Sequence, residues 1–253
     1  MTAPVPRMRM VAGPNGSGKS TLNGLLRPDL FGVYVNADDI ERQVRETGGT
    51  LDLRAYGVHA YEPEVLMHFT NSRLLEVAGL SDAAKALHFW GGRLDFRDVP
   101  FNAYFAAVAA GFIRIKLLVV GASFTFETVM SSPDKLALLR DARARGYRTY
   151  LYYVATDDPT ANVLRVRQRV RRGGHAVPED KIVSRYHRSL ALLADAVRLT
   201  DRAYVWDNSG ASLLWLAEVT GGRHLELRTE HVPQWFRRAL LDAPRGPRPT
   251  VDA

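Results

Sequence analysis

A short glycine-rich segment near the start of the chain has the residue types and spacing of a phosphate-binding loop. The letters GPNGSGKST fit the pattern G-x-x-x-x-G-K-[ST], in which a lysine reaches the β- and γ-phosphates of a nucleotide and a serine hydroxyl binds Mg²⁺. Glycines let backbone N–H groups converge on an anion, and the following helix adds positive potential. The motif predicts binding of ATP with Mg²⁺, with Ser20 as the metal ligand. The predicted ATP-binding residues are Gly13, Pro14, Asn15, Gly16, Ser17, Gly18, Lys19, Ser20 and Thr21.

An acidic pair follows the second predicted strand, which runs from Gly32 to Val35. Open α/β folds hold their sites at the carboxyl ends of parallel strands. A carboxylate placed there accepts the proton of an attacking hydroxyl during phosphoryl transfer. We therefore assign Asp38 as the catalytic base and Asp39 as the cap of the helix that begins with IERQV. The competing interpretation of Asp38 is a plain helix cap.

A second carboxylate ends the predicted strand within SFTFETV. Glu127 at this position is suited to bind Mg²⁺ through water or to hold a substrate hydroxyl, and Thr128 offers a further hydroxyl contact. Both residues are predicted to bind the substrate. The alternative is a solvated charge at the end of a strand, which the apolar character of this strand disfavours.

The densest group of positive charges lies in the letters RVRQRVRR, from Arg165 to Arg172. So many like charges disfavour a helix, and an anion is expected to offset them. Arginines of a mobile lid stabilise the charge on a transferred phosphoryl group. Arg165 and Arg169 share one helix face and are the predicted catalytic pair, although a second face carries arginines as well. The alternative is a solvated basic face.

The same segment contains a diglycine, Gly173–Gly174, that we expect to act as the hinge of a lid spanning residues 160–178. His175 follows the diglycine and is predicted to contact phosphate or substrate. No H-x-x-x-H spacing occurs near it, so a zinc site is not expected.

The elements that must position these side chains alternate between strands and helices. Strands are expected at Met8–Ala12 and in YRTYLYYVAT and AYVWDNSG, and the crossovers imply a mostly parallel, helix-flanked sheet. The tyrosines of YLYY are expected in the core rather than in a base-stacking platform. The turn in WDNSG is either an adenine-binding element or an Asx turn.

Other segments carry more local expectations. LHFWGGRLDFRDVP is predicted to be an irregular connection, and LLWLAEVTGG with HLELRT a hairpin. Ser132 is the expected cap of the helix in SPDKLALLRDARARGY, and one helix is expected from Pro178 to about Leu199. We predict a single domain over residues 1–242, with a helical insertion or substrate region at 41–120 and a disordered tail at 243–253.

Composition limits the class of protein. The 253 residues are 46% apolar, which is enough for one large α/β core, and the absence of cysteine excludes disulfides and thiolate metal sites. No stretch has signal-peptide form or approaches the ~18 apolar residues of a membrane span, so we expect a cytoplasmic protein without a membrane partner. The net charge of +7 favours a nucleic-acid partner, but its concentration in clustered arginines favours a phosphate clamp at least as strongly.

Taken together, these motifs resemble the zeta-toxin-like P-loop kinases of bacteria. The matching letters are GPNGSGKST, NADDI, SFTFETVMS, YRTYLYYVAT, RVRQRVRRGGHAVP, KIVSRYHRSL and DNSG, in the order of the family. The resemblance implies a P-loop kinase fold and transfer of a phosphoryl group from ATP to a hydroxyl, in the best-known members that of UDP-N-acetylglucosamine. It places the catalytic base on Asp38, the phosphate-binding lysine on Lys19 and the substrate-side glutamate on Glu127. It also implies lid arginines, one within residues 165–172 and a second near position 175, where this chain departs from the family and has His175, and an antitoxin protein as a partner.

The sequence departs from the family where the acceptor is bound. A threonine and an arginine that follow the glutamate in toxins of known action are replaced by Val129 and Ser131. The resemblance therefore supports the kinase core more strongly than the nucleotide-sugar acceptor, and other hydroxylated metabolites stay open. The alternatives are a nucleic-acid kinase or nucleic-acid-associated ATPase, for which LYYVATDD is a poor Walker B strand, and a nucleotide-binding regulatory module without chemistry.

Overall fold

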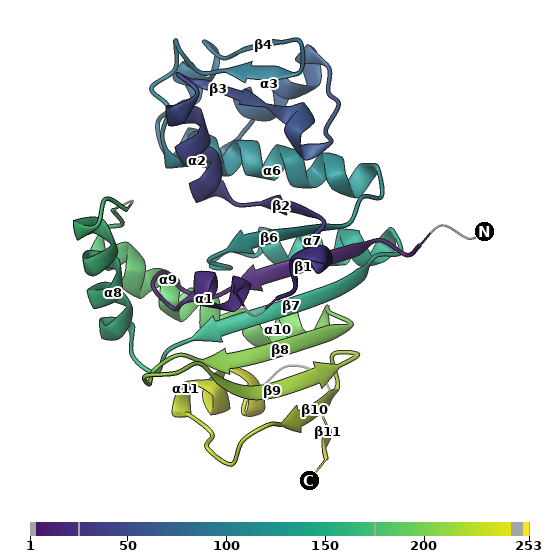
Figure 1. Ribbon diagram of the computed structural model, residues 1–253, viewed down its shortest axis with the longest axis vertical. Coiled ribbons are helices and arrows are strands. Elements are labelled where there is room, and N and C mark those ends of the chain that lie inside the picture. Colours follow the sequence, from purple (N-terminus) through teal and green to yellow (C-terminus); the bar gives the residue numbers. More distant parts are fainter. Residues whose placement is uncertain (1–3, 25, 175, 244–249, 253) are drawn as a thin grey trace. The chain divides into compact units, whose positions relative to one another are not determined.

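The computed structural model describes residues 4–24, 26–174, 176–243 and 250–252. The chain divides into two compact units: unit 1 comprises Met1–Phe31 and Glu127–Ala253, and unit 2 comprises Gly32–Phe126. Strands alternate with helices, and most neighbouring strands in the main sheet run parallel (Figure 1). The predicted α/β class with a mostly parallel, helix-flanked sheet is confirmed.

Unit 1 is built on strands that lie in the order β11-β10-β9-β8-β7-β1. Strand β7 pairs in parallel with β1 and β8, whereas β9 is antiparallel to β8 and β10. The β9–β10 pair confirms the predicted hairpin. The strands are β1 (Arg7–Ala12), β7 (Arg148–Ala155), β8 (Arg202–Asp207), β9 (Leu214–Thr220), β10 (His224–Leu227) and β11 (Thr250–Asp252).

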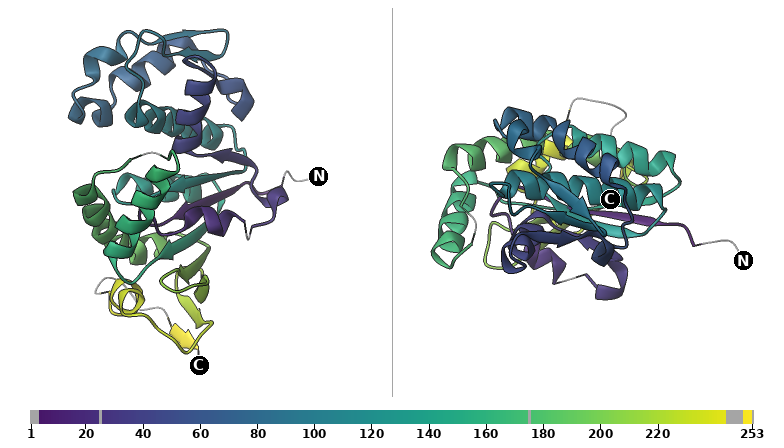
Figure 2. Two further views of the ribbon diagram at one scale, coloured as in Figure 1. Left: turned by 60° about the vertical axis from the view of Figure 1, so that its left-hand side comes forward. Right: turned by 90° about the horizontal axis from the view of Figure 1, so that it is seen from above.

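The two faces of this sheet are covered differently. On one face, the Tyr153 hydroxyl of β7 hydrogen-bonds Ser189 of α9, and the Tyr153 ring packs beside Trp235 of α11. On the other face, Leu22 of the short helix α1 packs against Val11 and Tyr152. Helix α8 begins just after the carboxyl end of β7 (Figures 1 and 2). The helical segments of unit 1 are α1 (Lys19–Asn23), η1 (Pro28–Leu30), α7 (Asp134–Ala144), α8 (Pro159–Arg171), α9 (Glu179–Ala191), α10 (Leu193–Arg198), α11 (Gln234–Phe236) and η3 (Arg237–Leu241).

Unit 2 contains a parallel pair of strands and a separate small sheet. Strand β2 (Val33–Val35) pairs in parallel with β6 (Phe124–Thr128), whose last two residues belong to unit 1. Helices α2 (Ala37–Glu46) and α6 (Ala103–Val119) pack against each other. The other elements are β3 (Thr50–Asp52), η2 (Leu53–Tyr56), α3 (Glu62–Thr70), α4 (Arg73–Val77), α5 (Ser81–Ala84), β4 (His88–Trp90) and β5 (Arg93–Asp95).

The segment predicted to be an irregular connection is instead a hairpin, so that prediction was wrong. Strands β4 and β5 pair antiparallel across Gly91 and Gly92, which have φ values of 56° and 81°. β3 joins the other edge of β5 to complete an antiparallel sheet. Two glycines in a left-handed conformation match the right-handed twist of a hairpin, and this dipeptide was the overlooked signal.

Several helix ends differ from the sequence expectation. The cap of α2 is Asn36, whose side chain accepts a hydrogen bond from the Asp38 amide at 2.9 Å, and not Asp39. Pro133, and not Ser132, precedes α7. The helix expected from Pro178 to Leu199 breaks at Leu192 into α9 and α10. For α2, the hydrogen bond from the Asp38 amide to the Asn36 side chain fixes the start of the helix.

The last part of the chain is described only in part. Within the tail expected to be disordered, Thr250–Asp252 pair in parallel with β10 as strand β11. Residues 244–249 lie outside the described residues. Within the residues that are described, no helix combines the length and apolarity needed to cross a bilayer.

Candidate active site

The glycine-rich loop connects β1 to α1, as the motif requires. Gly16 and Gly18 have φ values of 76° and 101°, which side chains rarely adopt. The loop is also tightly enclosed, because a Cβ at Gly16 would lie 2.5 Å from the Asn162 carbonyl oxygen and one at Gly18 would lie 2.2 Å from Nδ2 of Asn208. Both glycines are therefore required by backbone conformation and by close approach of neighbours.

Lys19 folds back over the loop. Its Nζ donates hydrogen bonds to the carbonyl oxygens of Gly13 at 2.9 Å and Pro14 at 3.0 Å. A phosphate placed in the loop would meet an ammonium group already held above the backbone amides. Ser20 and Thr21, at the start of α1, are exposed. The geometry thus presents the cation and the hydroxyls that the motif predicted.

Several polar atoms in and beside the loop are buried without a hydrogen-bond partner among the described residues. They are Oδ1 of Asn15, Oγ of Ser17, Nδ2 of Asn162 and Nη1 of Arg165. Buried polar groups in folded proteins are nearly always paired, so a cluster of unpaired ones calls for an explanation. A bound polar ligand would supply one, and these atoms surround the loop where the motif places a nucleotide.

Asn208 ties the loop to the neighbouring elements. Its Nδ2 donates to the Ser17 carbonyl oxygen at 2.8 Å, and its own amide donates to the Ala155 carbonyl oxygen at 2.8 Å. Its carbonyl oxygen accepts a hydrogen bond from Nη2 of Arg165, also at 2.8 Å. One residue therefore connects the loop, the end of β7 and helix α8. The preceding Asp207 accepts hydrogen bonds from Ser209, which confirms an Asx turn here.

The first turns of α8 contact the phosphate-binding loop and the residues that follow β7. Asp158 caps the helix by accepting from the Thr160 amide, and this bond lowers the pKa of the Asp158 carboxyl. Asn162 is fully buried, and its Oδ1 accepts a hydrogen bond from the Thr156 hydroxyl at 2.6 Å. Since Asn162 also lies against Gly16, the start of the helix is in direct contact with the loop.

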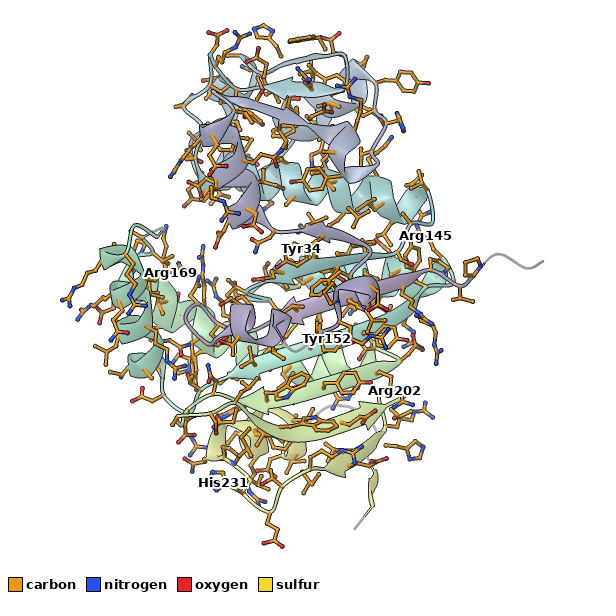
Figure 3. All side chains as sticks on the ribbon, in the orientation of Figure 1. Tyr34, Arg145, Tyr152, Arg169, Arg202 and His231 are labelled. Atoms are coloured by element: carbon orange, nitrogen blue, oxygen red, sulfur yellow. The ribbon has the colours of Figure 1, made fainter. Side chains whose placement is uncertain are left out.

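The arginines of α8 divide into two faces. Arg167 forms an ion pair with Glu179, and Arg167 and Arg171 line an apolar pocket of about 420 Å³ between α8 and α9. Arg165 lies on the opposite face and reaches Asn208, and Arg169 follows it one turn later. Arg169 is exposed (Figure 3). Of the two arginine faces, the one with Arg165 and Arg169 is therefore the one whose first arginine lies beside the phosphate-binding loop.

The diglycine ends α8 by capping it. Gly173, at φ 87°, donates its amide to the Val170 carbonyl, and the Gly174 amide donates to Arg169. This is the usual way in which a left-handed glycine closes a helix. The predicted hinge role of the diglycine stays a prediction, and His175 lies outside the described residues.

The end of β6 lies beside the loop within unit 1. The Gly13 amide donates to the Thr128 carbonyl oxygen at 3.3 Å, and Oγ1 of Thr128 accepts from the Met130 amide at 3.0 Å. Met130 is fully buried and has a φ of 51°, a strained conformation for a side chain of this size. Strain of this kind is tolerated where the surroundings fix it. Met130 lies three residues after Glu127, which is of intermediate exposure.

The predicted base belongs to unit 2. Asp38 is exposed and occupies the first turn of α2, where the partial positive charge of the helix favours a carboxylate. Asp39 forms an ion pair with Arg42 at 2.7 Å, and the buried Glu41 pairs with Arg45. Of these three acidic residues, Asp38 is the exposed one, and it lies two positions after the capping residue Asn36.

Comparison with known proteins agrees with the resemblance drawn from the motifs. Residues 113–220 match the model of the zeta toxin family. This match includes β6, α8 and the loop with Asn208, whereas the phosphate-binding loop and Asp38 precede it. Over residues 113–220 the zeta-toxin-like assignment is therefore confirmed, on evidence independent of the glycine-rich loop.

Similar sequences and structures extend the comparison. An uncharacterized protein of Haemophilus influenzae is 23% identical over 174 residues, which cover 69% of this chain and 88% of that protein. A crystal structure of the AvrRxo1-ORF1:AvrRxo1-ORF2 complex with sulphate ions is similar with a TM-score of 0.52 at 12% identity, over 88% of this chain. This chain covers 61% of that AvrRxo1 chain. The PezAT toxin–antitoxin structure of Streptococcus pneumoniae has a TM-score of 0.46 at 15% identity, over 84% of this chain and 73% of that chain. The fold of this chain is therefore similar to that of the AvrRxo1 chain.

Two residues of the site were not singled out by the sequence. Asn162 and Asn208 both contact the loop, although they lie far from it along the chain; Asn208 belongs to the DNSG motif, but its contact with the loop was not predicted. The signal that was present is weak: an asparagine following a strand in WDNSG, and an asparagine in the first turns of an otherwise arginine-rich helix.

Proposed function

We propose that this protein is an ATP-dependent kinase that transfers the γ-phosphoryl group to a hydroxyl of a small metabolite. The observation that carries the proposal is the phosphate-binding loop, formed with Lys19 above its carbonyl oxygens and braced by Asn208 against the arginine-bearing helix α8. A loop with a lysine binds phosphates, and an adjoining arginine supports transfer because it stabilises charge in the transition state.

Each residue has a role in this proposal. Lys19 and the loop amides hold the β- and γ-phosphates, and Arg169 neutralises charge that develops during transfer. Ser20 would hold Mg²⁺, which supplies charge neutralisation at the phosphates when bound. Asp38 accepts the proton of the acceptor hydroxyl, and Glu127 with Thr128 holds the acceptor.

The acceptor proposed first is UDP-N-acetylglucosamine, on the strength of the zeta toxin match over residues 113–220. A protein partner of antitoxin type and a cytoplasmic location belong to the same proposal. The AvrRxo1-ORF1 structure contains a second chain, AvrRxo1-ORF2, which makes a regulating partner a reasonable expectation.

The proposal is tested with γ-labelled ATP and a bacterial metabolite extract, followed by separation and identification of the labelled product. We expect one labelled, phosphatase-sensitive metabolite with the wild type and none with Lys19→Ala. UDP-N-acetylglucosamine alone, other hydroxylated metabolites and an oligonucleotide serve as separate acceptors. Label that appears only in inorganic phosphate would contradict the kinase proposal, and label in the oligonucleotide would contradict the small-molecule acceptor.

A further inference from the structure

The last helical segment of unit 1 is anchored in the core by aromatic side chains. Helix α11 follows Pro233 and continues into η3, and its Trp235 and Phe236 are 4% and 0% exposed. The Trp235 and Tyr153 rings have their centroids 6.3 Å apart, and Tyr153, a tyrosine of β7 that was expected in the core, is fully buried. Figure 1 shows α11 beside this sheet. The helix lies beyond residues 113–220, the part of the chain that matches the zeta toxin family.

A polar bond from α11 reaches the turn that carries Asn208. The indole Nε1 of Trp235 donates a buried hydrogen bond of 2.8 Å to Oδ1 of Asp207, the last residue of β8. The same carboxylate accepts from the Ser209 hydroxyl at 2.7 Å and, through Oδ2, from the Ser209 amide at 3.1 Å. The amide bond belongs to the backbone, so it does not depend on the side chain at position 209. The Asp207 carboxylate thus joins α11 to both ends of a turn whose middle residue is Asn208.

The burial of Asp207 gives the indole bond its weight. Asp207 is 5% exposed, and the three hydrogen bonds that its carboxylate accepts from Trp235 and Ser209 come from neutral donors. A buried carboxylate needs donors that replace its hydration, and hydrogen bonds to a charged group are stronger than those between neutral groups. Of these three donors, the indole N–H is the one that lies outside the turn. Its removal would therefore detach the turn from α11.

Asn208 transmits this constraint to the phosphate-binding loop. Its side chain donates to the Ser17 carbonyl oxygen, and its carbonyl oxygen accepts from Arg165. A Cβ at Gly18 would lie 2.2 Å from Nδ2 of Asn208, so the amide group is packed directly against the loop backbone. Even a small shift of the turn would therefore alter the position of the loop.

We propose that Trp235 and Asp207 are positioning residues of the nucleotide site, so that α11 sets the affinity for ATP through Asn208. This inference rests on the proposed kinase function, because it takes the loop to bind ATP. Trp235 holds the Asp207 carboxylate, the carboxylate holds the turn, and the turn places the Asn208 side chain on the loop. Because coupling between two sites is reciprocal, ATP in the loop also stabilises the packing of α11 against the sheet.

The test is calorimetric titration with ATP. Trp235→Phe keeps an aromatic ring beside Tyr153 but removes the N–H, and should weaken ATP binding by about three- to fivefold. Asp207→Asn replaces an acceptor oxygen by an amide group and should weaken ATP binding by roughly tenfold. Tyr153→Phe is the matched control, because it removes a buried hydroxyl that lies 3.0 Å from the Ser189 hydroxyl and leaves Asp207 untouched. Its ATP affinity should equal that of the wild type.

A double variant separates positioning from a general loss of stability. If Trp235 acts through Asn208, Trp235→Phe should lower ATP affinity in the wild-type background and have no further effect in the Asn208→Ala background. Thermal unfolding of every variant measures the loss of stability, and Tyr153→Phe shows how far such a loss alone changes ATP affinity. At saturating ATP, ADP release by Trp235→Phe should stay near the wild-type rate, which places the effect in binding and not in transfer.

The outcomes distinguish this inference from the kinase proposal. Equal ATP affinities of the wild type and Trp235→Phe would overturn the inference and leave the kinase proposal intact. The same conclusion would follow if Tyr153→Phe lost as much ATP affinity as Trp235→Phe, or if the loss from Trp235→Phe persisted in full in the Asn208→Ala background. A wild type that binds no ATP would overturn both.

Discussion

The two ends of helix α8 differ in how they are held, although both carry arginine. At the first end, Asn162 is fully buried against Gly16, and Arg165 is bound to the Asn208 carbonyl. At the other end, Arg169 and Arg171 are exposed, and Gly173 has open space around its α-carbon. The anchored end is suited to shape the nucleotide site, and the exposed end is suited to move toward a ligand.

This difference changes the interpretation of the arginine cluster. The sequence treats Arg165 and Arg169 as an equivalent catalytic pair, but Arg165 is hydrogen-bonded to the Asn208 carbonyl beside the loop, whereas the Arg169 side chain is exposed. We therefore expect Arg165 to contribute mainly to nucleotide binding and Arg169 mainly to turnover. A lid that moved as one piece from residue 160 would have to break the contacts of Asn162 and Arg165.

Among variants of helix α8, the largest effect is expected at the exposed end. Arg169→Ala should lower kcat by roughly 10²–10³-fold, with a small change in ATP affinity, because an arginine that acts on transition-state charge has a differential effect. Arg171→Ala, on the other face of the same helix, is the matched control and should retain near-normal turnover. Steady-state ADP release with the identified acceptor measures both. If Arg169→Ala and Arg171→Ala lower kcat equally, the assignment of the catalytic role to the face with Arg169 is wrong.

A smaller effect concerns stability. Gly16→Ala adds a methyl group that would lie 2.5 Å from a backbone carbonyl oxygen of Asn162, at a φ of 76°. The free energy of unfolding should fall by about 2 kcal/mol or more, because backbone strain and overpacking add. Gly173→Ala meets no neighbour within 4 Å, and should cost only about 1 kcal/mol through its left-handed conformation. Urea unfolding compares them, and equal losses would show that the anchored end is no more tightly packed than the exposed one.

Asn208→Ala tests the connection between the loop and the helix. It removes the hydrogen bond to the Ser17 carbonyl oxygen and should weaken ATP binding roughly tenfold, or about 1.4 kcal/mol. The backbone contact of Arg165 remains, so Arg165→Ala should weaken binding further in the double variant. Ser209→Ala is the control, because the Ser209 hydroxyl donates to Asp207 and accepts from the Asp157 amide, and neither contact involves the loop. Calorimetric titration with ATP gives each affinity. Normal ATP affinity of the Asn208→Ala variant would show that Asn208 does not hold the loop in its binding conformation.

The smallest effect is expected for the ion pair between α8 and α9. Arg167 and Glu179 have side-chain exposures of 60% and 57%, so water and salt screen their attraction. Arg167→Ala should change the free energy of unfolding by less than about 0.5 kcal/mol. It should also leave ATP affinity and turnover unchanged. A loss of turnover comparable with that of Arg169→Ala would show that the functional face of α8 is the one that carries Arg167 and Arg171.

The features that could be predicted from the sequence are those whose signals come from neighbouring residues. The phosphate-binding loop and the β9–β10 hairpin depend on neighbours in sequence, and both form as expected. The β4–β5 hairpin was missed although Gly91–Gly92 is a local turn signal. The Asn208–Ser17 bond joins positions 191 residues apart, and no single-sequence pattern encodes it. The functional roles of Asp38, Glu127 and Arg169 stay predictions.

The central claim, that the chain transfers a phosphoryl group and does not merely bind ATP, is tested most directly at Asp38. Asn keeps the shape of the side chain and also suits the first turn of α2, so Asp38→Asn should bind ATP normally. ATP affinity and acceptor-dependent ADP release are measured side by side for the wild type and this variant. We expect ADP release to fall by about 10²–10⁴-fold, the contribution of a positioned acid–base group, with ATP affinity unchanged. Near-normal ADP release by Asp38→Asn on the true acceptor would contradict the account.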